Sequence, residues 1–274
     1  MTLAARDVEY LRALLARNSG NRLEPSHDYL FESRLQHLLR DRGFPSVGDL
    51  VAALRRAQGS ALERCVAEAM TINETSFFRE PAAFDLLRDS LLPDLIERRR
   101  QRRTLRFWSA ACSSGQEAYS LAMLLRENFP QLAAWSIDIL GTDVSAGMVA
   151  RAEAGRYSRA EIRRGLPVPL QLRHMTRAGD EWEVAPAIGS LCRFQPRNLC
   201  TSPPLPQLRD VIFLRNVLLY FPPATRSHVL LTMHRSLAPD GILFLGASEQ
   251  MPDQSHWKAV MAPKTVWYSP LPAR

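Results

Sequence analysis

A loop of small residues and two nearby carboxylates are the side chains of this chain best suited to hold a ligand. The loop covers 109–115, reads Ser-Ala-Ala-Cys-Ser-Ser-Gly, and is followed almost at once by Glu117. Because its side chains are so small, a ligand could approach the backbone closely. Asp143 ends the next apolar segment, where dinucleotide-binding folds place an acidic residue that accepts hydrogen bonds from ribose hydroxyls. These residues indicate a site for a nucleotide-like ligand.

The glycine content of the loop narrows the choice of ligand. Gly115 is the only glycine within 109–115, so the loop lacks the glycine fingerprint that cradles a pyrophosphate. A cofactor with a ribose but no phosphates fits better, and S-adenosylmethionine is the foremost candidate. One alternative stays open for Glu117. Ser114 and Glu117 have the spacing of a capping box, in which the glutamate side chain would cap its own helix and not contact a ligand.

The segments around these residues have the pattern of an α/β domain. Leu105, Phe107 and Ser109 recur with the period of a strand, and helical periodicity begins at Gln116. Strands and helices continue to alternate, with a strand at 135–142, a helix at 145–154, a strand at 210–214, a helix at 224–237, a strand at 241–246 and a hairpin at 257–268. This order predicts a mostly parallel sheet with right-handed crossovers. Short strands at 175–184 and 191–194 interrupt it and predict a small antiparallel insert at about 167–197.

The first eighty residues have apolar stripes at helical spacing and predict a small helical bundle. Three parts of the chain are therefore expected: an N-terminal helical domain at 1–80, a linker helix with a basic run at 81–103, and a ligand-binding domain at 104–274. The basic run Glu-Arg-Arg-Arg-Gln-Arg-Arg at 97–103 is more typical of a solvated helix end than of a nucleic-acid patch.

Composition excludes several classes of protein. The 274 residues are 46% hydrophobic and 23% charged, which is typical of a globular protein. No apolar run approaches the roughly 20 residues of a membrane span, and the N-terminus does not resemble a secretory signal. The four cysteines are scattered, so neither a metal site nor a disulfide framework is expected, and a cytoplasmic location is favoured. The net charge of +7 favours an acidic partner, either a nucleic acid or an acidic protein surface.

Several longer motifs resemble those of one family. They are Thr-Ile-Asn-Glu-Thr-Ser-Phe-Phe-Arg at 71–79, Phe-Gln-Pro-Arg-Asn-Leu at 194–199, Arg-Asn-Val-Leu-Leu-Tyr-Phe at 215–221, and the segment 237–249 that ends in Ala-Ser-Glu. With the 109–120 segment and Gly-Thr-Asp at 141–143, they resemble, in order and over nearly the whole chain, the CheR-type chemotaxis receptor methyltransferases.

The resemblance implies a fold, a reaction and a set of contacts. The fold would be α/β, a Rossmann-like S-adenosylmethionine methyltransferase fold with an N-terminal helical domain and a small antiparallel β insert. The enzyme would transfer a methyl group from S-adenosylmethionine to the side-chain carboxylate of receptor glutamates, leaving S-adenosylhomocysteine. Arg79 and Tyr220 would orient the receptor carboxylate. The implied cofactor contacts are Asn73, Thr75, Arg79, Glu117, Asp143, Asn198, Leu199, Asn216 and Val217.

Departures from the family motifs fall mainly on the substrate side. Leu214 stands where cysteine is common, Pro222 and Pro223 replace an acidic residue, and Ala247 stands where histidine is frequent. Two rival functions stay open: a nucleic-acid methyltransferase, and a non-catalytic adaptor that responds to S-adenosylmethionine. The segment that follows Asn216 lacks the Pro-Pro platform that suits a flipped base, which disfavours the first.

The expected partner is the cytoplasmic methylation region of a methyl-accepting chemotaxis receptor, with no nucleic acid and no membrane insertion. Some family members also bind a pentapeptide at the receptor C-terminus by adding it to an edge strand of the insert. The hairpin at 175–184 is a few residues shorter than in those members and has only Gly179. We therefore expect recognition without a C-terminal tether, although Trp182 could anchor a peptide.

Overall fold

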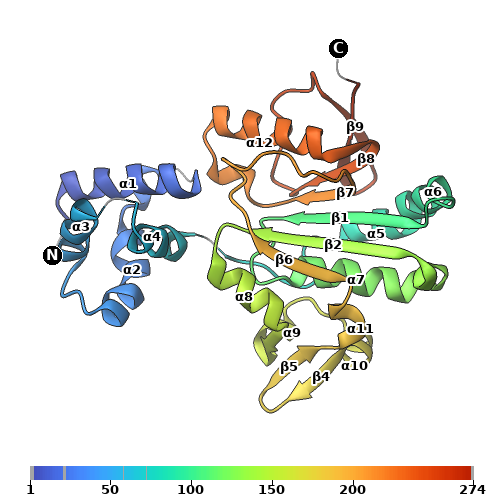
Figure 1. The fold of residues 1–274 in the computed structure, drawn as a ribbon, viewed down its shortest axis with the longest axis horizontal. Helices are drawn as coiled ribbons and strands as arrows, with labels where there is room; N and C mark the ends of the chain where they lie inside the picture. The colour runs from blue at the N-terminus through green and yellow to red at the C-terminus, as the bar shows by residue number, and fades with distance from the viewer. Residues whose placement is uncertain (1–2, 21–22, 58, 72, 273–274) are drawn as a thin grey trace. The chain divides into compact units, whose positions relative to one another are not determined.

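The computed structural model describes residues 3–20, 23–57, 59–71 and 73–272. The chain divides into two compact units: Met1–Ile72 with Tyr220–Arg226, and Asn73–Leu219 with Ser227–Arg274. Figure 1 shows the helices and strands of each unit.

The first unit is helical, as its apolar stripes predict. Leu11, Leu35, Leu50, Leu54 and Val66 come from four helices and are fully buried in one cluster, because each helix turns its apolar stripe inward. The helices are α1 (Ala5–Ser19), η1 (Pro25–His27), α2 (Tyr29–Arg42), α3 (Val47–Arg56) and α4 (Ala61–Met70).

The second unit is built on a mixed sheet with the strand order β6-β2-β1-β7-β8-β10-β9 (Figure 1). The strands from β6 to β8 are parallel, and β10 and β9 add an antiparallel hairpin at the edge. The predicted parallel sheet and C-terminal hairpin are therefore confirmed. The strands are β1 (Thr104–Ala110), β2 (Ser136–Asp143), β6 (Cys192–Pro196), β7 (Arg209–Leu214), β8 (Leu237–Leu245), β9 (Trp257–Ala262) and β10 (Thr265–Pro270).

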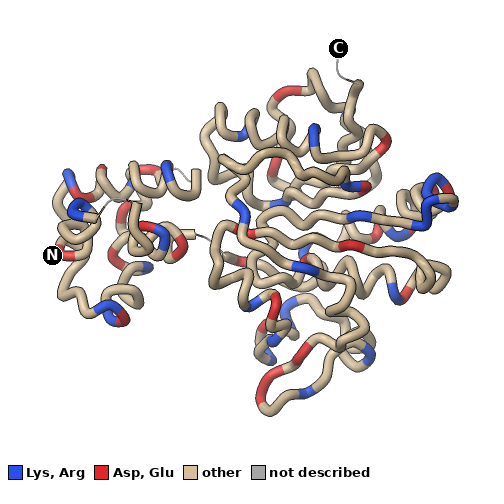
Figure 2. The backbone as a smooth tube through the Cα atoms, viewed as in Figure 1, with Lys and Arg blue, Asp and Glu red and all other residues tan. Residues whose placement is uncertain are grey.

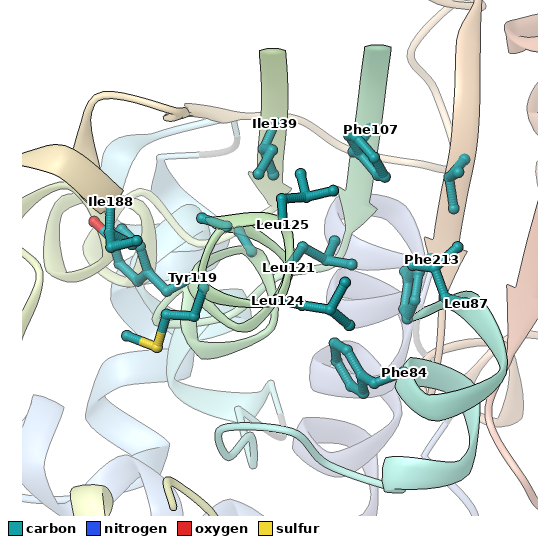
Figure 3. Packing of buried hydrophobic residues seen from close by; sticks show 14 of the residues in the cluster. Phe84, Leu87, Phe107, Tyr119, Leu121, Leu124, Leu125, Ile139, Ile188 and Phe213 are labelled. Atoms are coloured by element: carbon teal, nitrogen blue, oxygen red, sulfur yellow. The ribbon is translucent and has the colours of Figure 1, made fainter. Parts of the chain in front are cut away.

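Helix α7 packs its apolar side onto the parallel strands. Figure 3 shows Leu121 and Leu125 of this helix beside Phe107 and Ile139 of the sheet, and all four side chains are buried. The helical segments that accompany the sheet are α5 (Pro81–Leu86), η2 (Leu87–Leu91), α6 (Leu92–Arg98), α7 (Gln116–Asn128), η3 (Pro130–Ala134), α8 (Ala146–Ala154), α9 (Arg159–Arg163), α10 (Val168–His174), α11 (Pro186–Gly189), η4 (Leu218–Tyr220) and α12 (Pro223–Ser236).

The antiparallel insert differs from the prediction in its composition. Its sheet has the order β3-β5-β4, with β3 (Arg156–Ser158), β4 (Met175–Ala178) and β5 (Glu181–Val184). The strand expected at 191–194 does not belong to it, because β6 pairs in parallel with β2, with Cys192 opposite Ile139. A short apolar strand has no local signal that tells which sheet it joins, and here Cys192 and Phe194 pack against the main core.

The expected linker at 81–103 belongs to the second unit, and its arginines hold that unit together. Arg99 donates from Nε to Asp210 at 2.8 Å and from Nη1 to Asp240 at 2.7 Å, and Arg102 also pairs with Asp210. Figure 2 shows the arginines gathered around α6 and the start of β1. The buried partner Asp210 explains why this basic run is folded onto the sheet, because a buried carboxylate needs a paired cation.

We expect this ion-pair cluster to make stability depend on acid pH. Hydrogen bonds from Arg99 lower the pKa of Asp240 from 3.8 to about 2. A lowered pKa means that the stabilisation is complete above about pH 4 and is lost as the pH falls toward 2. The difference in urea midpoint between the wild type and Asp240→Asn should therefore be constant from pH 7 to 5 and shrink toward pH 3. The exposed Asp180→Asn serves as the control, and an Asp240→Asn difference that stays constant down to pH 3 would contradict the assignment.

Candidate functional site

The carboxyl ends of the parallel strands bring the predicted ligand-binding segments to one edge of the sheet. Strand β1 leads into the 109–115 loop, β2 ends at Asp143, β6 leads to Asn198, and β7 leads to Asn216. Open α/β sheets bind their ligands at this edge, because the loops that follow the strands converge there.

Ser113 joins two of the predicted contacts. Its backbone amide donates to Oδ2 of Asp143 at 2.8 Å, and its hydroxyl donates to the carbonyl oxygen of Asn73 at 2.8 Å. Asp143 is only 6% exposed, and its Oδ1 accepts from the Ser145 amide at 3.0 Å. Each carboxylate oxygen has a second lone pair, so the side chain can accept further hydrogen bonds from a ligand.

The same loop holds strained backbone. Ala111 and Ser113 have φ values of 61° and 49°, in the left-handed region that non-glycine residues rarely adopt. Phe78, Glu80 and Asn216, which flank the same strand ends, share this conformation, with φ between 48° and 58°. Strained backbone of this kind gathers at ligand sites, where the surrounding structure enforces it.

The capping-box interpretation of Glu117 is wrong. The N-cap of helix α7 is Gly115, which has no side chain that could cap the helix. Ser114, the capping residue of the predicted box, instead donates to Oε1 of Gln116 at 2.9 Å. Glu117 accepts from the Ser109 hydroxyl at 2.7 Å and from Nη1 of Arg215 at 2.9 Å. Its carboxylate is therefore turned toward the strand ends, where the positive end of the helix dipole favours it.

A buried guanidinium, Arg215, connects Glu117 to the segment that follows Asn73. Besides Glu117, it donates to Oε2 of Glu80 at 2.9 Å and to the carbonyl oxygen of Arg79 at 2.6 Å. Burial raises the pKa of Glu80, but hydrogen bonds from Asn216, the Ala247 amide and Arg215 outweigh it. The pKa of this carboxyl therefore lies below its ordinary value, and Glu80 stays ionised at neutral pH.

A further carboxylate, Glu249, fixes the loop after β7. It accepts hydrogen bonds from the backbone amides of Asn216 at 2.8 Å, Val217 at 2.8 Å and Leu218 at 2.7 Å. Gly246 also donates to it at 2.8 Å, and a Cβ at Gly246 would lie only 2.8 Å from Nδ2 of Asn216 and from Oε2 of Glu249. Three chemically important residues, Glu80, Arg215 and Glu249, were thus not predicted as site residues, although Arg215 and Glu249 lie within the family-like motifs and Glu80 directly follows one.

The remaining predicted residues have separate surroundings. Arg79 is half-buried and donates to the carbonyl oxygen of Glu74 at 2.8 Å, and Thr75 is half-buried in the same segment. Asn198 accepts from the Cys200 amide at 2.9 Å, and the neighbouring Leu199 is buried. Tyr220 ends η4 and belongs to the first unit, so its predicted role in the site stays a prediction.

The chemistry of this edge fits S-adenosylmethionine. Carboxylates outnumber the buried guanidinium, which suits a ligand with a sulfonium and an ammonium group, and carboxylate oxygens also accept from ribose hydroxyls. The small-residue loop leaves its backbone approachable. Because Gly115 is the only glycine of that loop, a pyrophosphate fits less well.

Comparison with known proteins decides the family. The family description "CheR methyltransferase, SAM binding domain" matches residues 73–266, and "CheR methyltransferase, all-alpha domain" matches residues 6–71. The chain belongs to the CheR methyltransferase family. It is an S-adenosylmethionine-dependent methyltransferase with the Rossmann-like fold of such enzymes.

Named relatives extend over nearly the whole chain. "Chemotaxis protein methyltransferase 1" of Pseudomonas aeruginosa is 40% identical over 98% of this chain and 99% of its own length. "Chemotaxis protein methyltransferase Cher2" of Pseudomonas putida is 37% identical over 96% of this chain and 97% of its own length. "Chemotaxis protein methyltransferase" of Vibrio parahaemolyticus is 36% identical over 92% of this chain and 91% of its own length. Among the residues that the structure describes, no helix has the length and apolar character of a membrane span.

Proposed function

We propose that this enzyme works in the cytoplasm on the methylation region of a chemotaxis receptor, which it recognises without a tether to the receptor C-terminus. The reaction is the transfer of a methyl group from S-adenosylmethionine to receptor glutamate side chains. The observation that carries the proposed site is that two consecutive βα units both place a carboxylate at the 109–115 loop. There Glu117 and Asp143 both lie within reach of one small-residue loop.

Each site residue is proposed to have a distinct task. Asp143 accepts from the ribose hydroxyls, and Glu117 receives the ammonium group of the methionine moiety. Asn198 and Asn216 supply amide donors and acceptors, next to backbone contacts at Leu199 and Val217. Asn73 and Thr75 complete the cofactor site, and Arg79 and Tyr220 orient the reacting carboxylate. S-adenosylmethionine supplies an electrophilic methyl group on a good leaving group.

No general base is required for this reaction. A glutamate carboxyl has an ordinary pKa of about 4.3, so the receptor side chain is already an anion and a nucleophile at neutral pH. Positioning in line with the methyl group and exclusion of water can therefore supply most of the rate acceleration. Arg79 is suited to the positioning task, because a guanidinium binds a carboxylate through two parallel hydrogen bonds.

Transfer of a labelled methyl group to receptor fragments tests the proposal. We expect label to enter cytoplasmic receptor fragments and to be released as methanol by mild alkali, as an ester of glutamate is. Replacing the receptor glutamates by alanine should abolish incorporation. Label in nucleic acid in place of receptor would favour the first rival function. Binding of S-adenosylmethionine without transfer to any receptor in a panel would favour the adaptor.

Arg79→Lys should reduce kcat/KM for a receptor fragment by about tenfold, because an ammonium group cannot form the bidentate pair with a carboxylate. The dissociation constant of S-adenosylmethionine, measured by calorimetry, then shows whether Arg79 binds the carboxylate of the receptor or that of the cofactor. Arg164→Lys, which alters an exposed arginine paired with Glu74, is the matched control. Unchanged kinetics and unchanged affinity in Arg79→Lys would remove Arg79 from the site.

We predict that the C-terminal peptide of the receptor does not bind to the antiparallel insert. Strand β4 is an edge strand of four residues, and it is joined to β5 by the two-residue turn 179–180, so little backbone is available for strand addition. Trp182 is half-buried and packs against the main core, which supports a structural role for its ring. A receptor-tail pentapeptide should show no saturable binding below about 100 µM. Low-micromolar binding that Trp182→Ala abolishes would contradict the prediction.

A further inference from the structure

We infer that Arg215 is a positioning residue that couples the cofactor side of the site to its substrate side. This inference rests on the proposed function, because it takes Glu117 as the partner of the cofactor ammonium group and Arg79 as the partner of a carboxylate.

The geometry around Arg215 is that of a shared anchor. Its side chain is 1% exposed, and its terminal nitrogens are divided between two segments of the site. Nη1 donates to Glu117 at 2.9 Å, and Nη2 donates to Glu80 at 2.9 Å and to the carbonyl oxygen of Arg79 at 2.6 Å. One rigid planar group therefore sets the place of Glu117 and of the backbone that carries the Arg79 side chain.

The surroundings of the guanidinium hold it in one orientation. Its Cζ lies 5.6 Å and 5.7 Å from the ring centroids of Phe84 and Phe213, within the range of cation–π attraction. Its Nε–H has no hydrogen-bond partner among the described residues. The guanidinium thus lies beside two neighbouring aromatic rings, whose centroids are 5.4 Å apart, and its hydrogen bonds are made by the two terminal nitrogens.

Arg215 also has the right charge for a coupling role. It stands between two carboxylates, and it cannot pair more closely with one without weakening its hold on the other. Glu117 has a further donor in Ser109, but among the described residues Ser109 forms no hydrogen bond with Glu80 or Arg79. Loss of Ser109 should therefore disturb the cofactor side alone, whereas a change at Arg215 should disturb both sides.

Two measurements test the coupling on the full-length protein. The first is calorimetric binding of S-adenosylhomocysteine and of an analogue that lacks the α-amino group. The second is the KM for a receptor fragment. The wild type should prefer the amine-bearing ligand by about tenfold, because the analogue loses one charge-assisted pair. Arg215→Lys should reduce this preference to about twofold and raise the receptor KM about fivefold. Ser109→Ala should reduce the preference and leave the receptor KM unchanged.

Arg209→Lys is the matched control. Arg209 is also a buried arginine and pairs with Asp138 at 2.5 Å, but it begins β7, whereas Arg215 follows the end of that strand. Its replacement should change neither the preference nor the receptor KM.

If Arg215→Lys does not fold, Glu80→Gln takes its place. The neutral glutamine lets the guanidinium move toward Glu117, so the amine preference should fall about threefold, although Glu80 is linked to Glu117 only through Arg215 among the described residues.

The outcomes separate the inference from the proposed function. An Arg215→Lys variant that binds both ligands more weakly by the same factor would overturn the inference, because a purely structural role lowers both affinities alike. A wild type with no preference for the amine-bearing ligand would overturn the proposed role of Glu117 and the inference together. A changed preference with an unchanged receptor KM would overturn the coupling.

Discussion

Replacing Asp143 by alanine should weaken binding of S-adenosylmethionine by about 100-fold. The proposed role of this carboxylate is to accept from two ribose hydroxyls, and hydrogen bonds to a charged group contribute about 1.5–3 kcal/mol each. Two such bonds correspond to at least two orders of magnitude in the dissociation constant. The variant also removes the acceptor of the Ser113 amide, so the small-residue loop loses one of its fixed points. Isothermal calorimetry measures the change directly.

The same strand offers a control for this variant. Asp138 lies near the start of β2, where it pairs with Arg193 and Arg209 away from the ligand edge. Asp138→Asn should therefore lower stability and leave the affinity for S-adenosylmethionine within about twofold of the wild type. An Asp143→Ala variant with wild-type affinity would show that the ribose is not bound at the end of β2.

Glu249→Ala should lower the free energy of unfolding by about 2–4 kcal/mol and reduce kcat as well. One carboxylate accepts from the amides of Asn216, Val217, Leu218 and Gly246, and removing it leaves these donors to water or without a partner. Each partly buried unsatisfied donor costs about 1 kcal/mol. The backbone of Asn216 would then no longer be held in its left-handed conformation at φ 58°. The proposed cofactor contacts on this loop would be displaced as a result.

Urea unfolding and steady-state kinetics together test this role. Glu249→Gln should be less affected than Glu249→Ala, because its amide oxygen still accepts from some of these backbone amides. Gln250→Ala changes the exposed neighbouring residue and should match the wild type. If Glu249→Ala were as stable and as active as Gln250→Ala, the carboxylate would not be what holds the loop.

The sequence by itself determined the regular elements and most of the proposed cofactor contacts. Apolar spacing predicted the helices of the first unit and the parallel strands β1, β2, β7 and β8, because burial of one helix face or of a whole strand leaves a periodic pattern. The place of Asp143 at a strand end and of Glu117 in the first turn of a helix followed from the same patterns. The family-like motifs added Asn73, Asn198 and Asn216.

Only the tertiary structure decided how these residues are held. The sequence was compatible with Glu117 as a helix cap and as a ligand contact, and the cap was excluded when Ser109 and Arg215 proved to be the partners of the Glu117 carboxylate. It also assigned β6 to the insert and treated the arginines of 97–103 as a solvated linker. In each case the deciding contact joins residues far apart in the chain, such as Arg99 and Asp210. Local patterns record which face of a segment is buried, but they contain no information on which distant partner buries it.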